Sequence, residues 1–213
     1  NFLARLSHEI RTPMNAVIGI TDALIQHSPD TQSLSKLKLI QSSADNIMNI
    51  LEGTLSHNKL DADKLMLDPK PGNPRETVKS ICALWEPLAK KNGTTIRCHI
   101  DEKTPKNVSF DRFRYEQCLN NLLSNAVKFT PNGSVHVIMT LAGGDTPKPR
   151  LLLAVKDTGI GMTAEQQTRI FEAYTQADQS ISSRFGGTGL GMNIAKRIIE
   201  LMGGSITVKS ELG

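Results

Sequence analysis

Two helical stripes of apolar residues occupy the first quarter of the chain. The first stripe has alternating spacings of three and four residues and consists of Leu3, Leu6, Ile10, Pro13, Val17, Ile20 and Leu24. The second has the same helical period and consists of Leu37, Ile40, Ala44, Ile47 and Leu51. Between them, residues 28–31 read Ser-Pro-Asp-Thr, which is typical of a turn that ends in a helix cap. The pattern therefore predicts a helical hairpin over residues 1–60.

A hairpin of this size buries too little apolar surface by itself. Alternating three- and four-residue spacing is typical of a seam between packed helices, so we expect two copies to form a dimeric four-helix bundle. Packing of the stripe on the rest of the same chain is the alternative. Pro13 interrupts the backbone hydrogen bonding of the first helix and predicts a kink one turn after His8.

His8 falls on the helix face opposite the apolar stripe, so we expect it to be exposed. Glu9 is adjacent and Thr12 follows four residues later on the same face as His8. The zinc-protease pattern His-Glu-x-x-His is not completed, because Thr12 stands where the second histidine ligand belongs.

The pattern changes after residue 60 to alternating strands and helices. Strands are predicted over residues 64–67, 95–100, 134–141, 151–156 and 205–209, and helices over 75–90, 112–129, 164–174 and 192–202. Residues 55–63 read as a linker and residues 69–74 as a proline-rich loop. Because the hydrophobic strands need helices to cover at least one face, residues 61–213 are predicted to form an α/β sandwich. The whole chain is thus expected to be of the α+β class.

Composition narrows the class of protein but does not identify it. The 25 basic and 21 acidic residues give a net charge of +4 without a long basic run, so we expect a solvated exterior rather than a nucleic-acid surface. Cys82, Cys98 and Cys118 lack metal-ligand spacing and are interpreted as buried thiols in a reducing compartment. No apolar run approaches the roughly 18 residues of a membrane span. This segment is expected to be cytoplasmic and without membrane contact of its own, whether or not its parent protein is anchored.

The predicted helix over 112–129 has a polar face whose side chains could bind a cation and phosphate. Asn121, Asn125 and Lys128 lie within about 60° of one another on a helical wheel. The opposite face carries Leu119, Leu122, Leu123 and Ala126. Amide oxygens can bind a hard cation, and a lysine on the same face can reach phosphate oxygens.

Two glycine clusters lie further along the chain. The run Asp157-Thr158-Gly159-Ile160-Gly161 directly follows a predicted strand, and the run from Gly186 to Gly191 opens a predicted helix. The aspartate can accept a hydrogen bond from an exocyclic amine, the first glycines would let a ring approach the backbone, and the helix start suits a triphosphate. Neither cluster matches a P-loop or a Rossmann fingerprint. Residues 171–183 between them are interpreted as a mobile lid.

Five segments together resemble the conserved boxes of sensor histidine kinases. Residues 7–15 (Ser-His-Glu-Ile-Arg-Thr-Pro-Met-Asn) resemble the H box, residues 121–130 the N box, residues 157–161 the first G box, residues 171–174 the F box and residues 187–191 the second G box. The order and spacing are those of the family and extend over essentially the whole chain. The H box and the lid resemble those of hybrid kinases in particular.

The resemblance implies a dimerisation and phosphotransfer hairpin followed by an ATP-binding domain of the gyrase, Hsp90 and histidine kinase type. His8 would be the phosphoacceptor, Glu9 would orient its ring or accept its proton, and Thr12 would position water in a reverse phosphatase reaction. Asn125 would hold Mg²⁺ with Asn121 nearby, Lys128 would contact phosphate and Asp157 would bind the adenine amine. The full set implied to bind ATP is Asn121, Asn125, Lys128, Asp157, Gly159, Gly161, Phe171, Arg184, Gly187, Thr188, Gly189, Leu190 and Gly191.

The resemblance also implies an activity and partners. ATP-dependent autophosphorylation of His8 would be followed by transfer to an aspartate of a response-regulator receiver domain, on the same polypeptide or another. The alternatives are a catalytically silent dimeric scaffold that binds receivers and an ATP-driven machine of the gyrase or chaperone type. Two features depart from the family pattern. The last strand of the ATP-binding domain is missing after residues 205–211. Many relatives also have a lid arginine three residues after the aromatic pair of the F box, where residues 174–178 read Tyr-Thr-Gln-Ala-Asp, so Arg184 is the candidate for the lid cation instead.

Overall fold

The structure is a computed structural model that describes five parts of the chain. These are residues 2–27, helical positions between 33 and 47 (33–34, 36–37, 40–41, 43–44 and 47), and residues 66–142, 150–173 and 189–213; for residues 2–9 and 27 only the backbone is described. The chain divides into two compact units, one of residues 1–65 with 172–194 and one of residues 66–171 with 195–213. Each unit is described by itself.

The first unit is built on helix α1 (Phe2–His27), which confirms the first predicted helix and continues through Pro13. The described residues between 33 and 47 are also helical. Gln41 Nε2 donates a hydrogen bond to Asp22 Oδ1, and Thr21 and Ala44 are both buried, so the two segments pack together. The predicted turn at residues 28–31 lies outside the described residues. In the part of the chain that the structure describes, no helix is long and apolar enough to cross a membrane.

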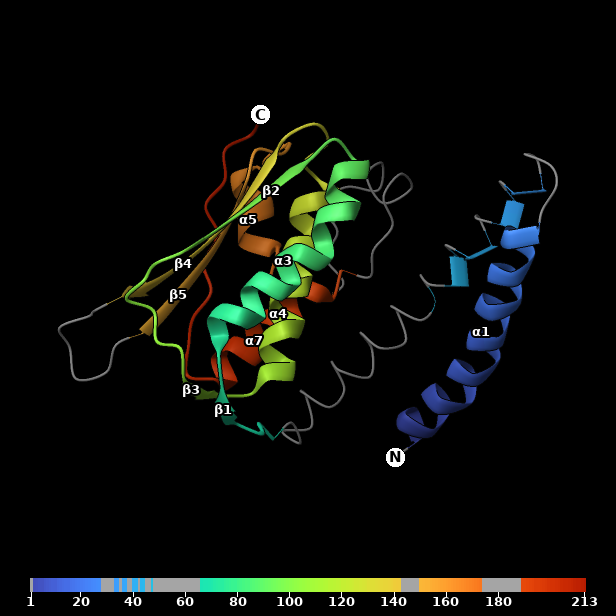
Figure 1. Cartoon of the computed structure of the whole chain (residues 1–213), viewed down its shortest axis with the longest axis horizontal. Coiled ribbons are helices and arrows are strands. Elements are labelled where there is room, and N and C mark those ends of the chain that lie inside the picture. The colour runs from blue at the N-terminus through green and yellow to red at the C-terminus, as the bar shows by residue number, and fades with distance from the viewer. Residues whose placement is uncertain are drawn as a thin grey trace. The chain divides into compact units, whose positions relative to one another are not determined.

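The second unit has a layer of helices on a three-stranded sheet (Figure 1). Strand β4 (Ser134–Ala142) lies in the middle, parallel to β2 (Thr95–Ile100) and antiparallel to β5 (Arg150–Asp157), with Val137 opposite both Cys98 and Val155. Helices α3 (Pro74–Lys91) and α4 (Arg112–Lys128) cover one face of this sheet. Helices α5 (Ala164–Arg169) and α7 (Gly191–Leu201) follow, the second of them shared between the units.

A single core joins the sheet to α3 and α4. Alternate residues of β4 point into it, and Val135, Val137 and Met139 have no exposed surface. They meet a set of buried side chains from the two helices that includes Val78, Ile81, Leu119, Leu123 and Val127. The alternation of buried and half-buried positions along β4 is the period-two pattern expected of a strand covered on one face.

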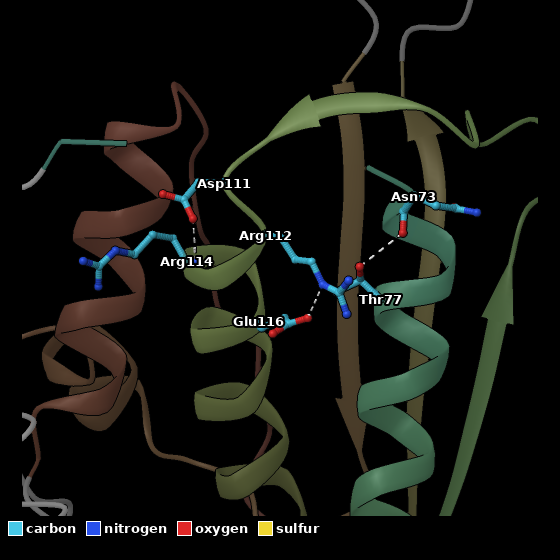
Figure 2. A network of polar contacts seen from close by, with 6 residues as sticks. All are labelled: Asn73, Thr77, Asp111, Arg112, Arg114 and Glu116. Atoms are coloured by element: carbon cyan, nitrogen blue, oxygen red, sulfur yellow. Dashed lines mark hydrogen bonds and ion pairs between the residues drawn. The ribbon is translucent and has the colours of Figure 1, made fainter. Parts of the chain in front are cut away.

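Capping side chains fix where α3 and α4 begin, and Figure 2 shows the cap of α4, in which Asp111 bonds Arg114. Asn73 Oδ1 accepts a hydrogen bond from Arg75 N at 3.1 Å, and Asp111 Oδ1 accepts one from Arg114 N at 3.0 Å. Asp111 Oδ2 also accepts from Asp68 N at 3.0 Å, so this buried carboxylate ties the start of the unit to α4. Such caps satisfy amides that have no partner inside the helix.

The α+β class is confirmed, and so are the helices and strands predicted between residues 75 and 156. Three predictions were wrong. Residues 66–67 are not a strand, and the predicted loop instead contains β1 (Lys70–Gly72), which pairs with the unpredicted β3 (Val108–Phe110). Helix α5 ends at Arg169 rather than residue 174. Residues 205–209 form no strand. The segment that follows is held by Gln167, which bonds both the N–H and the C=O of Ser210, and by Gly213 N, which donates to the Ile160 carbonyl.

Candidate functional site

The polar face of α4 has the layout that the sequence predicted. Asn121, Asn125 and Lys128 are half-buried. Of the four residues predicted on the apolar face, Leu119, Leu123 and Ala126 are buried and Leu122 is half-buried. Helix α4 therefore uses its apolar face for the core, and its amide groups remain on a partly accessible surface where their oxygens could bind a hard cation.

Lys128 is a partly desolvated cation at the end of this face. Burial lowers the pKa of its ammonium group, and Nζ lies 4.8 Å from the centroid of the Phe129 ring. The aromatic face compensates part of the lost hydration. An anion such as phosphate placed beside this ammonium would compensate more, because it would favour the charged form.

Asp157 stands at the end of β5 with a fixed carboxylate. Its Oδ1 accepts hydrogen bonds from Gly159 N at 3.0 Å and from the Thr130 hydroxyl at 3.4 Å. Among the described residues no donor bonds Oδ2. Asp157 is exposed, so an external donor such as an exocyclic amine can reach it.

The structure gives a reason for glycine at positions 159 and 161 that differs from the one predicted from the sequence. A Cβ at position 159 would overlap the Phe129 carbonyl oxygen, and one at Gly161, which has φ of +69°, would overlap the Glu211 carbonyl oxygen. The chain's own backbone thus occupies the space beside both glycines. Their predicted closeness to a bound ring stays a prediction.

Some of the other predicted site residues lie in the part of the chain that the structure describes, and some lie outside it. Phe171 is half-buried, with Lys196 Nζ 5.8 Å from its ring centroid. Gly189 has φ of +67°, Leu190 is buried, and Gly191 is the first residue of α7, one position before the predicted start. Thr12 is exposed on α1, and His8 and Glu9 lie in α1 with their side chains outside the described part. Arg184, Gly187 and Thr188, together with Tyr174 and residues 175–183 of the predicted lid, lie outside the described residues.

The structure brings together one residue pair that the sequence did not predict. Thr130 lies two residues after the end of α4, is fully buried, and bonds Asp157, which is 27 positions further along the chain. Ile160 N also donates to the Phe129 carbonyl at 3.2 Å, so the first glycine cluster is attached to the end of α4. No local pattern indicates these contacts, since they depend on how β5 is placed beside α4. No cluster of three or more metal-binding His, Cys, Asp or Glu side chains exists within the described ranges.

Two family models match the chain. Residues 1–63 match the His Kinase A (phospho-acceptor) domain, and residues 110–213 match the Histidine kinase-, DNA gyrase B-, and HSP90-like ATPase family. Together they include both the segment around His8 and the segments that contain α4, Asp157 and the second glycine cluster.

Curated relatives and solved structures agree with these models. The chain is 37% identical over 210 residues to the signal transduction histidine-protein kinase BarA of Escherichia coli K12, which covers 99% of this chain and 23% of BarA. It is 39% identical over 212 residues to the sensor protein GacS of Pseudomonas syringae pv. syringae, covering 100% of this chain and 23% of GacS. The crystal structure of full-length ShkA in complex with AMPPNP matches with a TM-score of 0.79 and 32% identity, over 99% of this chain and 43% of ShkA. The chain thus spans about a quarter of the length of the curated relatives.

Proposed function

Because the chain belongs to the histidine kinase family, with a phospho-acceptor domain followed by an ATPase domain of the gyrase and HSP90 type, we propose that it phosphorylates its own His8 from ATP. The phosphoryl group then passes to an aspartate of a receiver domain, as expected for relatives of the hybrid sensor kinases. The observation that supports this most is the Asp157 carboxylate, held at the end of β5 by Gly159 N and by the Thr130 hydroxyl, which lies just beyond the end of α4.

Asp157 is the proposed adenine-binding residue. The bonds from Gly159 and Thr130 hold its carboxylate at the end of β5, and an adenine amine can donate to Oδ2. The ShkA structure is a complex with AMPPNP, an ATP analogue, which supports a nucleotide at this domain type. Phe171 and residues 187–191, with Arg184, complete the proposed nucleotide set.

The donor set on α4 fits Mg²⁺ held between protein and nucleotide. The ion prefers oxygen ligands and keeps few protein ligands when substrate phosphates supply the others, so one or two amide oxygens are sufficient. We assign Asn125 as the ligand, with Asn121 nearby, and Lys128 as the phosphate contact. When bound, the ion neutralises charge on the phosphates. The protein's own contribution is to orient the phosphates along this helix face, which is most of what phosphoryl transfer requires.

His8 is the proposed nucleophile of the first unit. An imidazole with an ordinary pKa of about 6.5 is mostly neutral at pH 7 and keeps a lone pair for attack on phosphorus. Glu9 orients the ring or takes its proton, and Thr12, exposed one turn later, positions water for the reverse phosphatase reaction. Phosphorylation forms a nitrogen–phosphorus bond and breaks the bond from the γ-phosphorus to the bridging oxygen, with ADP as leaving group.

A homodimer is proposed from the exposed apolar surface of the first unit. Val17, Ile20 and Leu24 of α1 are exposed, and so are Ile40 and Ile47 of the following helical segment. The three α1 residues, called the α1 stripe from here on, and the two residues of the following segment all lie at the seam spacing read from the sequence. Packing two copies along this seam would form the four-helix bundle and remove the apolar surface from water.

Labelling with γ-labelled ATP tests the proposal. We expect a protein-bound phosphate that is lost in acid and kept in base, absent from His8→Ala and retained in His99→Ala, which alters an exposed histidine of β2. Asn125→Ala should abolish the label, whereas Asn107→Ala, at an exposed loop asparagine, should not.

Three results would contradict the assignment. Label retained in His8→Ala would remove His8 as acceptor. ATP binding without any label would favour the receiver-binding scaffold. Steady ATP hydrolysis that does not depend on His8 would favour an ATP-driven machine.

A further inference from the structure

Two cysteines of the second unit lie on facing surfaces, away from the proposed nucleotide-binding residues. Cys82 belongs to α3 and is 6% exposed as a member of the core. Cys98 lies in β2 between Ile96 and Ile100, both of which pack against that same core. Because side chains alternate along a strand, Cys98 shares the face of these two isoleucines, and that face is the one α3 packs on (Figure 1).

The position of β2 makes one of the two thiols accessible. The strand order is β2-β4-β5, so β2 is an edge of the sheet. The prediction that all three cysteines are buried is wrong for Cys98, which is exposed because it lies on an edge strand, although it faces the helix layer; Cys82 is buried. An exposed thiol backed by a buried one is the arrangement in which oxidation of the first can be followed by attack from the second.

The two thiols differ in acidity, and the exposed one is the more acidic. A hydrogen bond from the Cys82 thiol lowers the pKa of Cys98 to about 7, with help from the positive charge of Lys79, while burial acts in the opposite direction. The same hydrogen bond, together with burial, raises the pKa of Cys82. Tyr115 of α4 is a further titratable group that interacts with the pair, and its pKa is raised, mainly by burial. Cys98 is thus about half thiolate at neutral pH, and the thiolate is the form that reacts with oxidants.

We propose that Cys82 and Cys98 are a redox-modification site, at which a hydroperoxide converts the pair to a disulfide between α3 and β2. The Cys98 thiolate attacks a peroxide oxygen, the O–O bond breaks, and Cys98 becomes a sulfenic acid while hydroxide or alkoxide leaves. The Cys82 sulfur then attacks the Cys98 sulfur, the S–O bond breaks, and water leaves with the Cys82 proton. Two thiols are oxidised by two electrons and one peroxide is reduced by two; a dithiol reductant reverses the reaction.

Cys118 provides an internal comparison. It is buried in α4, its Sγ lies 3.7 Å from the Ala195 carbonyl oxygen, and burial raises its pKa to about 12. It has neither the accessibility nor the thiolate character of Cys98. Oxidation is therefore expected to be selective for one pair among three thiols in a single unit.

Peptide mapping of the whole chain tests the site. The reduced protein is treated with a small excess of hydrogen peroxide, alkylated and digested with trypsin, which places Cys82 in residues 80–90, Cys98 in 98–103 and Cys118 in 115–128. We expect a peptide joining 80–90 to 98–103, lighter by two hydrogen atoms than its parts and separated by dithiothreitol, with Cys118 alkylated. Cys118→Ala should give the same yield of linked peptide.

Two further measurements do not depend on the disulfide itself. In Cys82→Ala the Cys98 sulfenic acid should persist and be trapped by dimedone. The rate of Cys98 alkylation in the wild type should have its pH midpoint near 7, and Cys82→Ala should move it upward by about one unit or more. A wild-type midpoint at the ordinary thiol pKa of about 8.5 would overturn the proposal. So would linkage of Cys98 to Cys118 or to a second chain, or oxidation of Cys98 without any link to Cys82.

Discussion

Helices α1 and α4 are both amphipathic, but they use their apolar faces differently. Leu123 of α4 has no exposed surface, because the sheet and α3 cover it. Ile20 of α1 is 62% exposed and Leu24 is 50% exposed within one chain. The apolar face of α4 is satisfied internally, so its remaining polar face is available for a ligand. The apolar face of α1 is what a second copy would cover in the proposed dimer, so the two helices differ in which face is left for a binding partner.

The largest effect is expected where α4 enters the core. Leu123→Ala removes a fully buried side chain and should lower the free energy of unfolding of the second unit by roughly 3 kcal/mol. Leu152→Ala is the matched control, since this β5 leucine is mostly exposed and should change stability by less than about 0.5 kcal/mol. Denaturant unfolding measures both. Equal effects of the two substitutions would mean that α4 is not the core helix described here.

Substitutions in the α1 stripe should change the dimer dissociation constant rather than the folding of one chain. Ile20→Ala removes apolar surface from each of two copies, at about 1 kcal/mol per copy, and should raise the dimer dissociation constant roughly thirtyfold. Gln26→Ala, at an exposed α1 position off the stripe, should leave it unchanged. Sedimentation equilibrium across protein concentration gives both constants. A monomeric wild type, or equal dissociation constants, would refute the assembly role of the stripe.

One glycine in α1 and one beside the end of α4 should differ in the same way. A methyl group added at Gly19 in α1 would meet open space, whereas one added at Gly159 would overlap the Phe129 carbonyl oxygen at the α4 terminus. Gly19→Ala should therefore stabilise its helix by about 0.5–1 kcal/mol. Gly159→Ala forces the backbone apart and should destabilise the second unit by about 1–2 kcal/mol. Thermal unfolding of both variants distinguishes the signs, and stabilisation by Gly159→Ala would contradict the close packing of this loop on α4.

Much of this fold could be predicted from local patterns, because long elements carry many periodic positions. Strand β4 alternates from Ser134 to Thr140, and α4 has both a capping Asp111 and a clear apolar face. Strands β1 and β3 have three residues each, and β1 contains Pro71 and Gly72, so no local signal marks them. Their pairing joins segments nearly forty residues apart, which only tertiary packing determines.

The candidate site shows the same division. Motif order was sufficient to propose Asn125 and Asp157 as site residues. It could not show that Thr130 bonds the Asp157 carboxylate or that the space beside Gly159 is filled by the Phe129 carbonyl, because both contacts join α4 to the end of β5. Family motifs identify residue types at a site, whereas their supporting contacts arise from packing between elements.

The smallest effect is expected at Lys128, where the polar face of α4 should behave in the opposite way to the apolar one. Burial lowers its pKa, so between that value and the ordinary value of about 10.4 the unfolded chain holds a proton that the folded chain has lost. The free energy of unfolding should therefore rise with pH across this interval. Lys128→Met should remove that rise and stabilise the chain by a few tenths of a kcal/mol at pH 7, since the group is partly exposed. Lys91→Met, at the exposed end of α3, is the control.

If Lys128 contacts phosphate, Lys128→Met should also weaken ATP binding about tenfold while stability increases. A variant that lost stability and kept its ATP affinity would make Lys128 a structural residue.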